Sequence, residues 1–447
     1  MSADKKSTQH IDHYNRKKRK AGDKKGAIKP FIITLIITLA LGGGALLTLT
    51  LMDKTFTGDK TGGSGKGKDT GRVTAKVYDI TEQDKNVKDI SGQIQDEGAL
   101  GDGSRYGALL ADEELCRQNH IYGKDAAYAD EISMLFAGDI SFADGYDNIG
   151  SLRLRGGEID AAFDEATLSV MREADIFMVN NEFTYSTRGT PTENKQYTLR
   201  AQPDTVRYLG DMGVDIVSLA NNHTYDYGEV SLLDTLDTLE SADMPYVGAG
   251  RNIKEAMQPS YFIVHDVKIA IISATQIEKL DYPDTKGATD TSAGVFRCWN
   301  SSKVFDVIRQ AKEESDYVVV YVHWGTEMME QTDWAQDELA PKLADAGADL
   351  IIGDHPHILQ KIDYIGDTPV IYSLGNYWFN GKTRDTGLFE VTLDLEGRTN
   401  TLRFIPALQV NSTTNILTGE EKQRVLDYMQ SISPKVHIDS EGYVTRK

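Results

Sequence analysis

The chain has 447 residues, of which 40% are apolar and 26% are charged, so it can bury a large core and is not a low-complexity chain. The formal net charge is −20, but residues 1–76 carry a net +10 and residues 77–447 carry −30. No basic stripe of the kind that binds nucleic acid follows residue 29, which excludes nucleic acid as a partner. The opposite charges indicate that the two parts face different environments.

The N-terminal part predicts a membrane anchor. Residues 1–29 are basic and predict a disordered cytoplasmic tail that anionic lipid attracts. Residues 31–52 carry no charge, and a helix of that length spans about 33 Å, enough to cross a hydrocarbon core of roughly 30 Å. We predict a single transmembrane helix at 30–52, with the N-terminus in the cytoplasm and the large domain outside the cell. A buried core helix and a cleaved signal peptide are the alternatives, but no small-residue cleavage site follows the apolar stretch.

Two segments separate this anchor from the main domain. Residues 53–76 are rich in Gly, Lys and Thr and predict a flexible linker. Residues 77–130 are acidic and weakly patterned, with a helix expected at 108–119 and no role that we can assign. Cys116 and Cys298 lie far apart in the sequence, and both a disulfide and two unpaired thiols remain open.

From residue 131 the pattern is typical of an α/β domain, which we expect to extend to 412. Short apolar runs predict strands at 133–137, 176–179, 216–219, 268–273, 318–322, 350–352 and 370–373. Amphipathic stretches predict helices at 203–212, 230–242 and 333–346. Segments 387–395 and 401–410 predict a hairpin, and the C-terminal segment 413–447 contains a predicted helix at 420–431.

Polar residues of one chemical kind follow most of these strands. Ligands of α/β sheets bind beyond the carboxyl ends of the strands, so these positions are informative. Carboxylates, imidazoles and amides suited to a divalent metal follow six of the seven strands: Asp139, Glu182, Asn222, His223, His323, His355, His357 and Asn376. Each alone has an ordinary explanation as a cap, turn or surface residue. The concentration of four of the nine histidines at strand ends predicts a metal site.

The order of these residues resembles that of the calcineurin-like metallophosphoesterases. The fuller motifs at residues 181–182, 220–228, 248–250, 323–327, 354–357 and 373–376 resemble the CapA family of capsule (poly-γ-glutamate) biosynthesis proteins. The resemblance covers residues 132–380. It implies a four-layer α/β/β/α metallophosphatase-like sandwich with one or two divalent metal ions (Mn, Zn or Mg) as cofactor.

The resemblance also implies a role for each residue. Asp139 and His357 would hold the first metal, Glu182 would bridge, and Asn222, His323 and His355 would hold the second. His223 would act as general acid, with Asp226 holding its tautomer. Ser141 stands where the phosphoesterase pattern has a histidine, which weakens the first site. A mononuclear site, or one that does not hydrolyse phosphate esters efficiently, is therefore an alternative.

The function implied by the resemblance is synthesis, export or surface retention of an anionic polymer such as poly-γ-glutamate, within a polymer-synthesis membrane complex. A metal-dependent hydrolase of a phosphate ester or of capsule or cell-wall polymer is the first alternative, and a non-catalytic interaction domain is the second. Catalysis itself is left open.

Charge constrains how such a polymer could bind. A net −30 repels a polyanion, so direct binding requires metal ions or a local basic groove. Candidates for that groove are Lys195, Arg200, Arg207, Lys382 and Arg384, with ordinary surface charge as the alternative. We expect Arg200, Glu327 and Asn376 to contact substrate.

Overall fold

The computed structural model describes residues 104–277, 285–299 and 302–447. The predicted tail, transmembrane helix and linker at 1–76 lie outside the described residues, as does the first half of the acidic segment, residues 77–103. Among the helices that are described, none combines the length and the apolar character that spanning a membrane requires.

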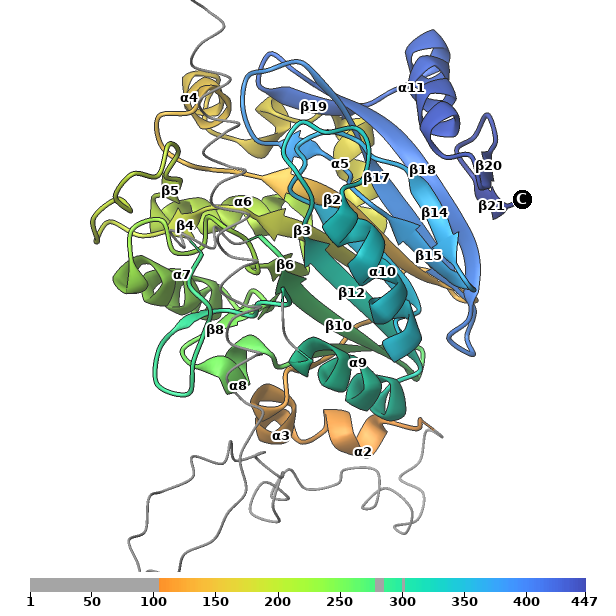
Figure 1. The fold of residues 1–447 in the computed structure, drawn as a ribbon, viewed down its shortest axis with the longest axis horizontal. Helices are drawn as coiled ribbons and strands as arrows, with labels where there is room; N and C mark the ends of the chain where they lie inside the picture. Colours follow the sequence, from red (N-terminus) through yellow and green to blue (C-terminus); the bar gives the residue numbers. More distant parts are fainter. Residues whose placement is uncertain (1–103, 278–284, 300–301) are drawn as a thin grey trace, which may run out of the picture. The chain divides into compact units, whose positions relative to one another are not determined.

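Two large β-sheets form the centre of the described fold (Figure 1). The seven-stranded sheet has the order β1 (Ile121–Gly123), β9 (Ser260–Val264), β10 (Val267–Thr275), β12 (Tyr317–His323), β13 (Leu350–Asp354), β15 (Thr368–Ile371), β14 (Ile362–Ile365). The eight-stranded sheet has the order β19 (Thr413–Ile416), β18 (Thr399–Val410), β17 (Arg384–Leu393), β2 (Ile132–Ile140), β3 (Ile176–Asn181), β6 (Ile216–Ser218), β7 (Tyr246–Val247), and β16 (Asn376–Trp378) also pairs with β2. The central strands of each sheet run parallel.

An apolar core lies between the two sheets. Met134 and Phe136 of β2 belong to this core, together with Ile271 of β10. Leu135 and Ala137, which alternate with them, belong instead to the core beneath the outer helices. Because successive side chains of a strand point to opposite faces, this division shows that both faces of the sheet are buried, as is usual for parallel strands.

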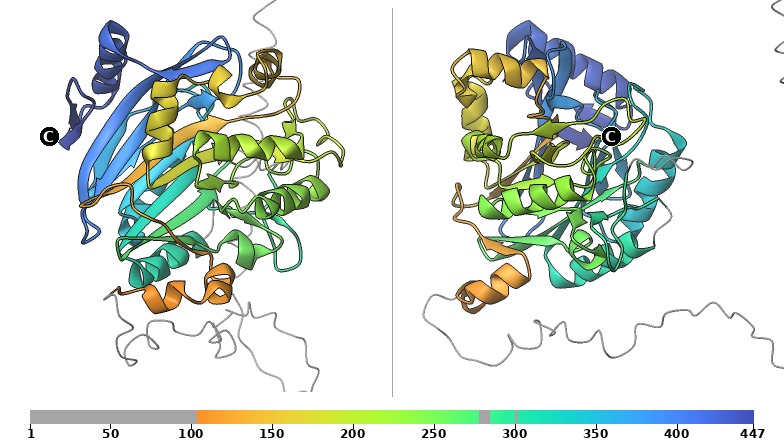
Figure 2. Two further views of the ribbon diagram at one scale, coloured as in Figure 1. Left: turned by 180° about the vertical axis from the view of Figure 1, so that it is seen from behind. Right: turned by 90° about the vertical axis from the view of Figure 1, so that its left-hand side faces the viewer.

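Helices cover the outer face of each sheet. Residues of α4 (Asp147–Leu154), α5 (Glu165–Glu173), α6 (Arg207–Met212) and α7 (Glu229–Ser241) share a core with the eight-stranded sheet. Residues of α2 (Gly107–Leu110), α3 (Glu113–Gln118), α8 (Ile253–Ala256), α9 (Lys303–Glu314) and α10 (Trp334–Ala346) do the same for the seven-stranded sheet. Figure 1 shows α9 and α10 on the near side, and the left view of Figure 2 shows α5, α6 and α7 from the opposite side. The α/β class is confirmed, and its layers run helix, sheet, sheet, helix.

Local sequence accounts for the elements that carry the site. In β12, the run Tyr-Val-Val-Val-Tyr-Val-His is rich in β-branched and aromatic residues and is buried on both faces. Helix α10 begins at a capping box in which Asp333 and Gln336 exchange hydrogen bonds, and it ends at Gly347 in the left-handed conformation.

The predicted elements largely match the observed ones. Each of the seven predicted strands overlaps an observed strand, the predicted hairpin is β17 and β18, and the predicted C-terminal helix is α11 (Gly419–Ile432). The predicted helix at 203–212 is a 3-10 turn (Pro203–Val206) followed by α6. Short paired strands complete the fold: β4 (Thr184–Tyr185) with β5 (Arg200–Ala201), β8 (Ala249–Gly250) with β11 (Gly294–Val295), and β20 (Val436–Ile438) with β21 (Val444–Arg446).

The described end of the acidic segment is part of the folded body. Two short helices, α2 and α3, stand where one helix was expected at 108–119, and β1 adds a parallel strand beside β9. Lys124 forms an ion pair with Asp215. Cys116 and Cys298 are both buried and no disulfide joins them, so the disulfide alternative is wrong.

Candidate metal centre

The carboxyl ends of the parallel strands bring the predicted site residues together. His323 of β12 is in register with Asp354 of β13, and Asp139 of β2 is in register with Asn180 of β3. His355 and Glu182 follow directly after β13 and β3. All six predicted metal ligands lie at these ends, and they come from both sheets.

Glu182 is the central carboxylate of this cluster. Its side chain is fully buried, and neither of its oxygens has a hydrogen-bond partner among the described residues. The Nε2 atoms of His223, His323 and His357 lie 3.8, 3.8 and 3.9 Å from its Oε1. These distances are too long for hydrogen bonds. They are closer to the separation between two ligand atoms of one tetrahedral zinc ion, which is roughly 3.4 Å. The unpaired carboxylate and the surrounding imidazoles therefore suit a cation.

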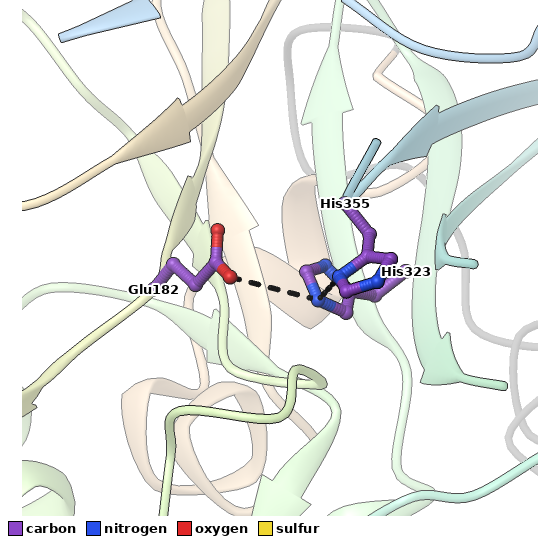
Figure 3. Close-up of side chains that lie close together, drawn as sticks. All are labelled: Glu182, His323 and His355. Carbon is purple, nitrogen blue, oxygen red and sulfur yellow. Dashed lines mark hydrogen bonds and ion pairs between the residues drawn. The ribbon is translucent and has the colours of Figure 1, made fainter. Parts of the chain in front are cut away.

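Three residue triplets could each hold a metal ion, because the potential ligand atoms within each triplet lie within 4.8 Å of one another. The triplets are Glu182–His323–His355, Asp139–His323–Asp354 and Asp139–Glu182–His357. Figure 3 shows the Glu182 carboxylate directed toward the rings of His323 and His355, which come from the other sheet. Because Glu182 belongs to two of these groups, the cluster could hold metal at two adjacent positions that share this carboxylate.

The position around His323 has the larger set of ligands. Nε2 of His323 lies 2.7 Å from Oδ1 of Asn222 and 3.0 Å from Nδ1 of His355. On the other side of the ring, Nδ1 lies 3.0 Å from Oδ1 of Asp354. A carboxylate behind a ligating histidine fixes the ring and its tautomer, so Asp354 directs Nε2 toward Glu182 and Asn222.

The position around Asp139 has fewer ligands. Nδ1 of His357 lies 3.0 Å from Oδ2 of Asp139 and 2.7 Å from Oδ1 of Asn376. The Asn180 amide donates to the other oxygen of Asp139 at 2.9 Å. The hydroxyl oxygen of Ser141 accepts a hydrogen bond from the Ala143 backbone N–H.

The backbone of the His-Pro-His turn is strained. His355 has φ 91° and His357 has φ 58°, in the left-handed region that non-glycine residues rarely adopt. Such strain persists only where the surrounding structure enforces it, and it clusters at functional sites.

Burial raises the pKa values of the carboxyl groups of Glu182 and Asp354, which a cation would reverse, and lowers the pKa of His323, which a cation would reinforce. Burial raises the pKa of Glu182 well above its usual range, and the charge of Asp139 adds to this effect. Burial and Asp139 raise the pKa of Asp354 in the same way. Burial lowers the pKa of His323 to about 3. For Asp139, burial is outweighed by the hydrogen bond and charge of His357, which bring its pKa to about 2. A divalent cation favours ionised carboxylates and neutral imidazoles, so these donors fit a metal.

A second series of interacting polar side chains lies next to Glu182. His223 presents Nε2 to Glu182, and its Nδ1 lies 2.7 Å from Oδ2 of Asp226, as predicted for a ring held in one tautomer. The ammonium group of Lys195 lies 2.6 Å from Oδ1 of Asp226 and is only 4% exposed. Lys195 was a candidate for a local basic groove, with ordinary surface charge as the alternative, and it is neither, because this cation is buried against an internal carboxylate.

The residues predicted to contact substrate lie in different environments. Arg200 is partly exposed, with its guanidinium 4.0 Å from the centre of the Tyr227 ring. Glu327 is exposed on the loop after β12. Asn376 is buried and bonded to His357, so it contacts a predicted metal ligand.

Sequence reasoning did not assign roles to Asp354 or Asn180, and it placed Lys195 wrongly. Asp354 stands at the end of a predicted strand directly before His355, and this position was a usable signal. No local pattern distinguishes Lys195 from the other lysines of the chain.

Comparisons with known proteins match the part of the chain that contains these residues. The family model described as "Bacterial capsule synthesis protein PGA_cap" matches residues 133–381, which include every predicted metal ligand. The chain is 33% identical over 240 residues to the capsule biosynthesis protein CapA of Bacillus anthracis, covering 52% of this chain and 57% of that protein. It is 32% identical over 237 residues to the PGA biosynthesis protein CapA of Bacillus subtilis (strain 168), covering 51% and 60%. The matches thus span less than two thirds of either relative. Among solved structures, a 5'-nucleotidase from Candida albicans SC5314 aligns with TM-score 0.34 and 9% identity over 64% of this chain and 53% of that one.

Proposed function

Because the chain belongs to the bacterial capsule synthesis protein family PGA_cap, we propose that it assists the synthesis, export or surface retention of an anionic capsule polymer such as poly-γ-glutamate. The proposal includes a metallophosphatase-like divalent-metal centre at the strand ends. It also includes an anchor at residues 30–52 that holds the domain at the outer surface of the cell, beside other membrane proteins of polymer synthesis.

The observation that carries the metal centre is the buried carboxylate of Glu182, which has no hydrogen-bond partner in the part of the chain that the structure describes. Asp139 and His357 would hold one ion with it, and Asn222, His323 and His355 would hold another. Asp354 and Asn376 would orient the rings of His323 and His357. Bound divalent ions would supply positive charge that polarises an anionic group of the substrate.

The charge of the centre favours an anionic ligand once metal is bound. Lys195 is a buried cation beside the centre, and four buried carboxylates lie in or beside it: those of Asp139, Glu182, Asp226 and Asp354. In their ionised forms these five groups carry −3, and two divalent ions would change this to +1. A local positive charge of this kind offsets the long-range repulsion between a polyanion and a domain of net charge −30.

Elemental analysis tests the metal centre. We expect the purified chain to hold one or two equivalents of Mn, Zn or Mg, and the His355→Ala/His357→Ala double variant to hold almost none. A His437→Ala variant is the matched control, because His437 is exposed on β20. Equal, near-zero metal in all three proteins would contradict the proposal.

Hydrolysis is a second candidate function, which the His223–Asp226 pair favours. With Nδ1 bonded to Asp226, Nε2 of His223 is directed toward the proposed metal centre. When the ring carries a proton on both nitrogens, Nε2 is placed to give its proton to a leaving group and return to the neutral form. The test is turnover of phosphodiesters and of γ-glutamyl polymer in the presence of Mn or Zn. Turnover that falls in His223→Ala would support a hydrolase, and absence of turnover would leave the accessory role.

Protease accessibility tests the proposed topology. We expect protease added to intact cells to digest the domain after residue 76 and to spare an epitope placed within residues 1–29. Protection of the domain in intact cells would contradict an external location.

A further inference from the structure

Lys195 is a buried cation that the set of proposed metal ligands does not explain. It lies on the loop between β4 and β5, where most neighbouring side chains are exposed, yet only 4% of its own side chain is exposed. Its ammonium group lies 2.6 Å from Oδ1 of Asp226 and also donates a hydrogen bond to the backbone carbonyl oxygen of Asn222. Lysine is rarely buried to this extent unless it is paired.

Further contacts join the same loop to the turn that carries Asn222 and His223. The Thr192 backbone N–H donates to the Asp226 carbonyl oxygen at 2.7 Å. The Leu199 backbone N–H donates to Oδ2 of Asp226 at 2.6 Å, the oxygen that also faces His223. The loop is therefore connected to the turn on both sides of Lys195.

The Asp226 carboxylate links Lys195 to the imidazole of His223. Oδ2 faces His223 and Leu199, whereas Oδ1 has no hydrogen-bond partner among the described residues and is compensated by the ion pair with Lys195. The plane of this fully buried carboxylate sets the plane of the imidazole, and Lys195 holds one of its two oxygens.

We propose that Lys195 is a positioning residue of the metal centre. By bridging the Asn222 carbonyl oxygen and the Asp226 carboxylate, it fixes the directions in which Oδ1 of Asn222 and Nε2 of His223 point. The proposal rests on the proposed function, since it assigns Lys195 to the same centre. Its contacts with the Asn222 carbonyl oxygen and the Asp226 carboxylate carry this effect to the centre.

The test compares Lys195→Met with the wild-type chain and with Lys254→Met, in which the same substitution removes an exposed lysine on α8. Calorimetric titration with Mn²⁺ should show affinity weakened by about 10- to 100-fold in Lys195→Met, the usual effect of losing a residue behind a metal ligand. Lys254→Met should bind like the wild type, and Lys195→Arg, which keeps the cation, should recover part of the loss. Equal affinity in Lys195→Met and the wild type would overturn the proposal.

A second readout does not require metal. In metal-free protein with ¹⁵N-labelled histidine, the Nδ1–H proton of His223 should give a resonance that is absent from His223→Gln. We expect this resonance to shift or disappear in Lys195→Met and to be retained in Lys254→Met. A merely structural role would lower the melting temperature without moving the resonance of the folded protein, and that result would overturn the proposal.

These two readouts separate the proposal from the proposed function. If the wild-type chain takes up no Mn²⁺, the metal centre fails and the imidazole resonance alone decides the role of Lys195. If Lys195→Met does not fold, Lys195→Gln takes its place, because it keeps a donor for the Asn222 carbonyl but lacks the charge. An unchanged resonance in folded Lys195→Gln would overturn the proposal in the same way.

Discussion

Nδ1 of His323 lies 3.0 Å from Oδ1 of Asp354, the residue that faces it in register on the neighbouring parallel strand. The hydrogen-bonding register of β12 and β13 thus places a carboxylate behind an imidazole. The opposite nitrogen of the ring is thereby directed across the gap between the sheets, toward Glu182. The register of these two strands therefore determines the orientation of His323 as a candidate ligand.

Replacing Asp354 should therefore weaken metal binding. We expect Asp354→Ala to reduce Mn²⁺ affinity by about 10- to 100-fold, because the His323 ring loses the contact that fixes its tautomer and plane. Calorimetric titration measures this, with Asp345→Ala as control because Asp345 is exposed on α10. Affinity that is equal in the two variants would show that the ring is held by other contacts.

Glu182→Gln should have opposite effects on metal content and on the stability of the metal-free protein. Burial and Asp139 raise the pKa of Glu182, so a carboxyl group at this position destabilises the metal-free fold. The isosteric amide removes the charge, and its donors face imidazole nitrogens. We expect a gain of roughly 1–3 kcal/mol in the unfolding free energy without metal, together with loss of bound metal.

Denaturant unfolding with and without Mn²⁺ tests this prediction. Wild-type protein should be stabilised by about 2.7 kcal/mol when Mn²⁺ is present at 100 times its Kd, whereas Glu182→Gln should respond little. Glu182→Gln that is less stable than the wild type in a chelator, or equally stabilised by Mn²⁺, would contradict it.

Gly138→Ala should disrupt the approach of β16 to β2. A Cβ atom at Gly138 would lie 1.9 Å from the carbonyl oxygen of Gly375, next to the hydrogen bond that this oxygen accepts from the Asp139 backbone. We expect a loss of roughly 3 kcal/mol or more in the unfolding free energy, because backbone rather than a flexible side chain must move. The separation of Asp139 and Asn376 should change with it.

Gly150→Ala is the matched control for that substitution. Gly150 lies within α4, and a Cβ atom there meets nothing within 4 Å. Alanine at this helical position should stabilise the protein by about 0.5–1 kcal/mol. Equal effects of the two glycine substitutions in thermal or denaturant unfolding would contradict the steric argument.

His120 should make stability fall at mildly acidic pH. Burial lowers its pKa below the usual 6.5, and the nearby Glu240 and Glu255 offset this only in part. The unfolded chain therefore binds a proton at this position before the folded chain does. The stability contributed by neutral His120 is present above pH 6.5 and is lost as the pH falls from 6.5 toward the folded pKa.

His120→Asn isolates this effect, because asparagine tolerates the left-handed backbone of residue 120, where φ is 52°. We expect the unfolding free energy of the wild type to fall more between pH 7 and pH 5 than that of His120→Asn. Parallel pH profiles for the two proteins would show that His120 does not titrate differently on unfolding.

Much of the secondary structure was predictable because its signals are local. The buried strands appear as β-branched runs, and α10 is marked by its capping box and its terminal glycine. The expected single helix at 108–119 is instead α2 and α3, because Asp112 interrupts the stretch and caps α3 with its side chain. Pairing partners were not predictable, since β16 joins β2 across more than 200 residues.

By itself, the sequence determined the α/β class and the types of residue at the strand ends, because hydrophobic periodicity and the residues after each apolar run are local properties. It thereby identified Glu182, His323 and His355 as candidate ligands. Only the tertiary structure decided that Glu182 is buried with no hydrogen-bond partner among the residues described and that Asp354 lies behind His323. It also decided that Lys195 is an internal cation, because the register of neighbouring strands and the packing of a distant loop against Asp226 depend on the whole fold.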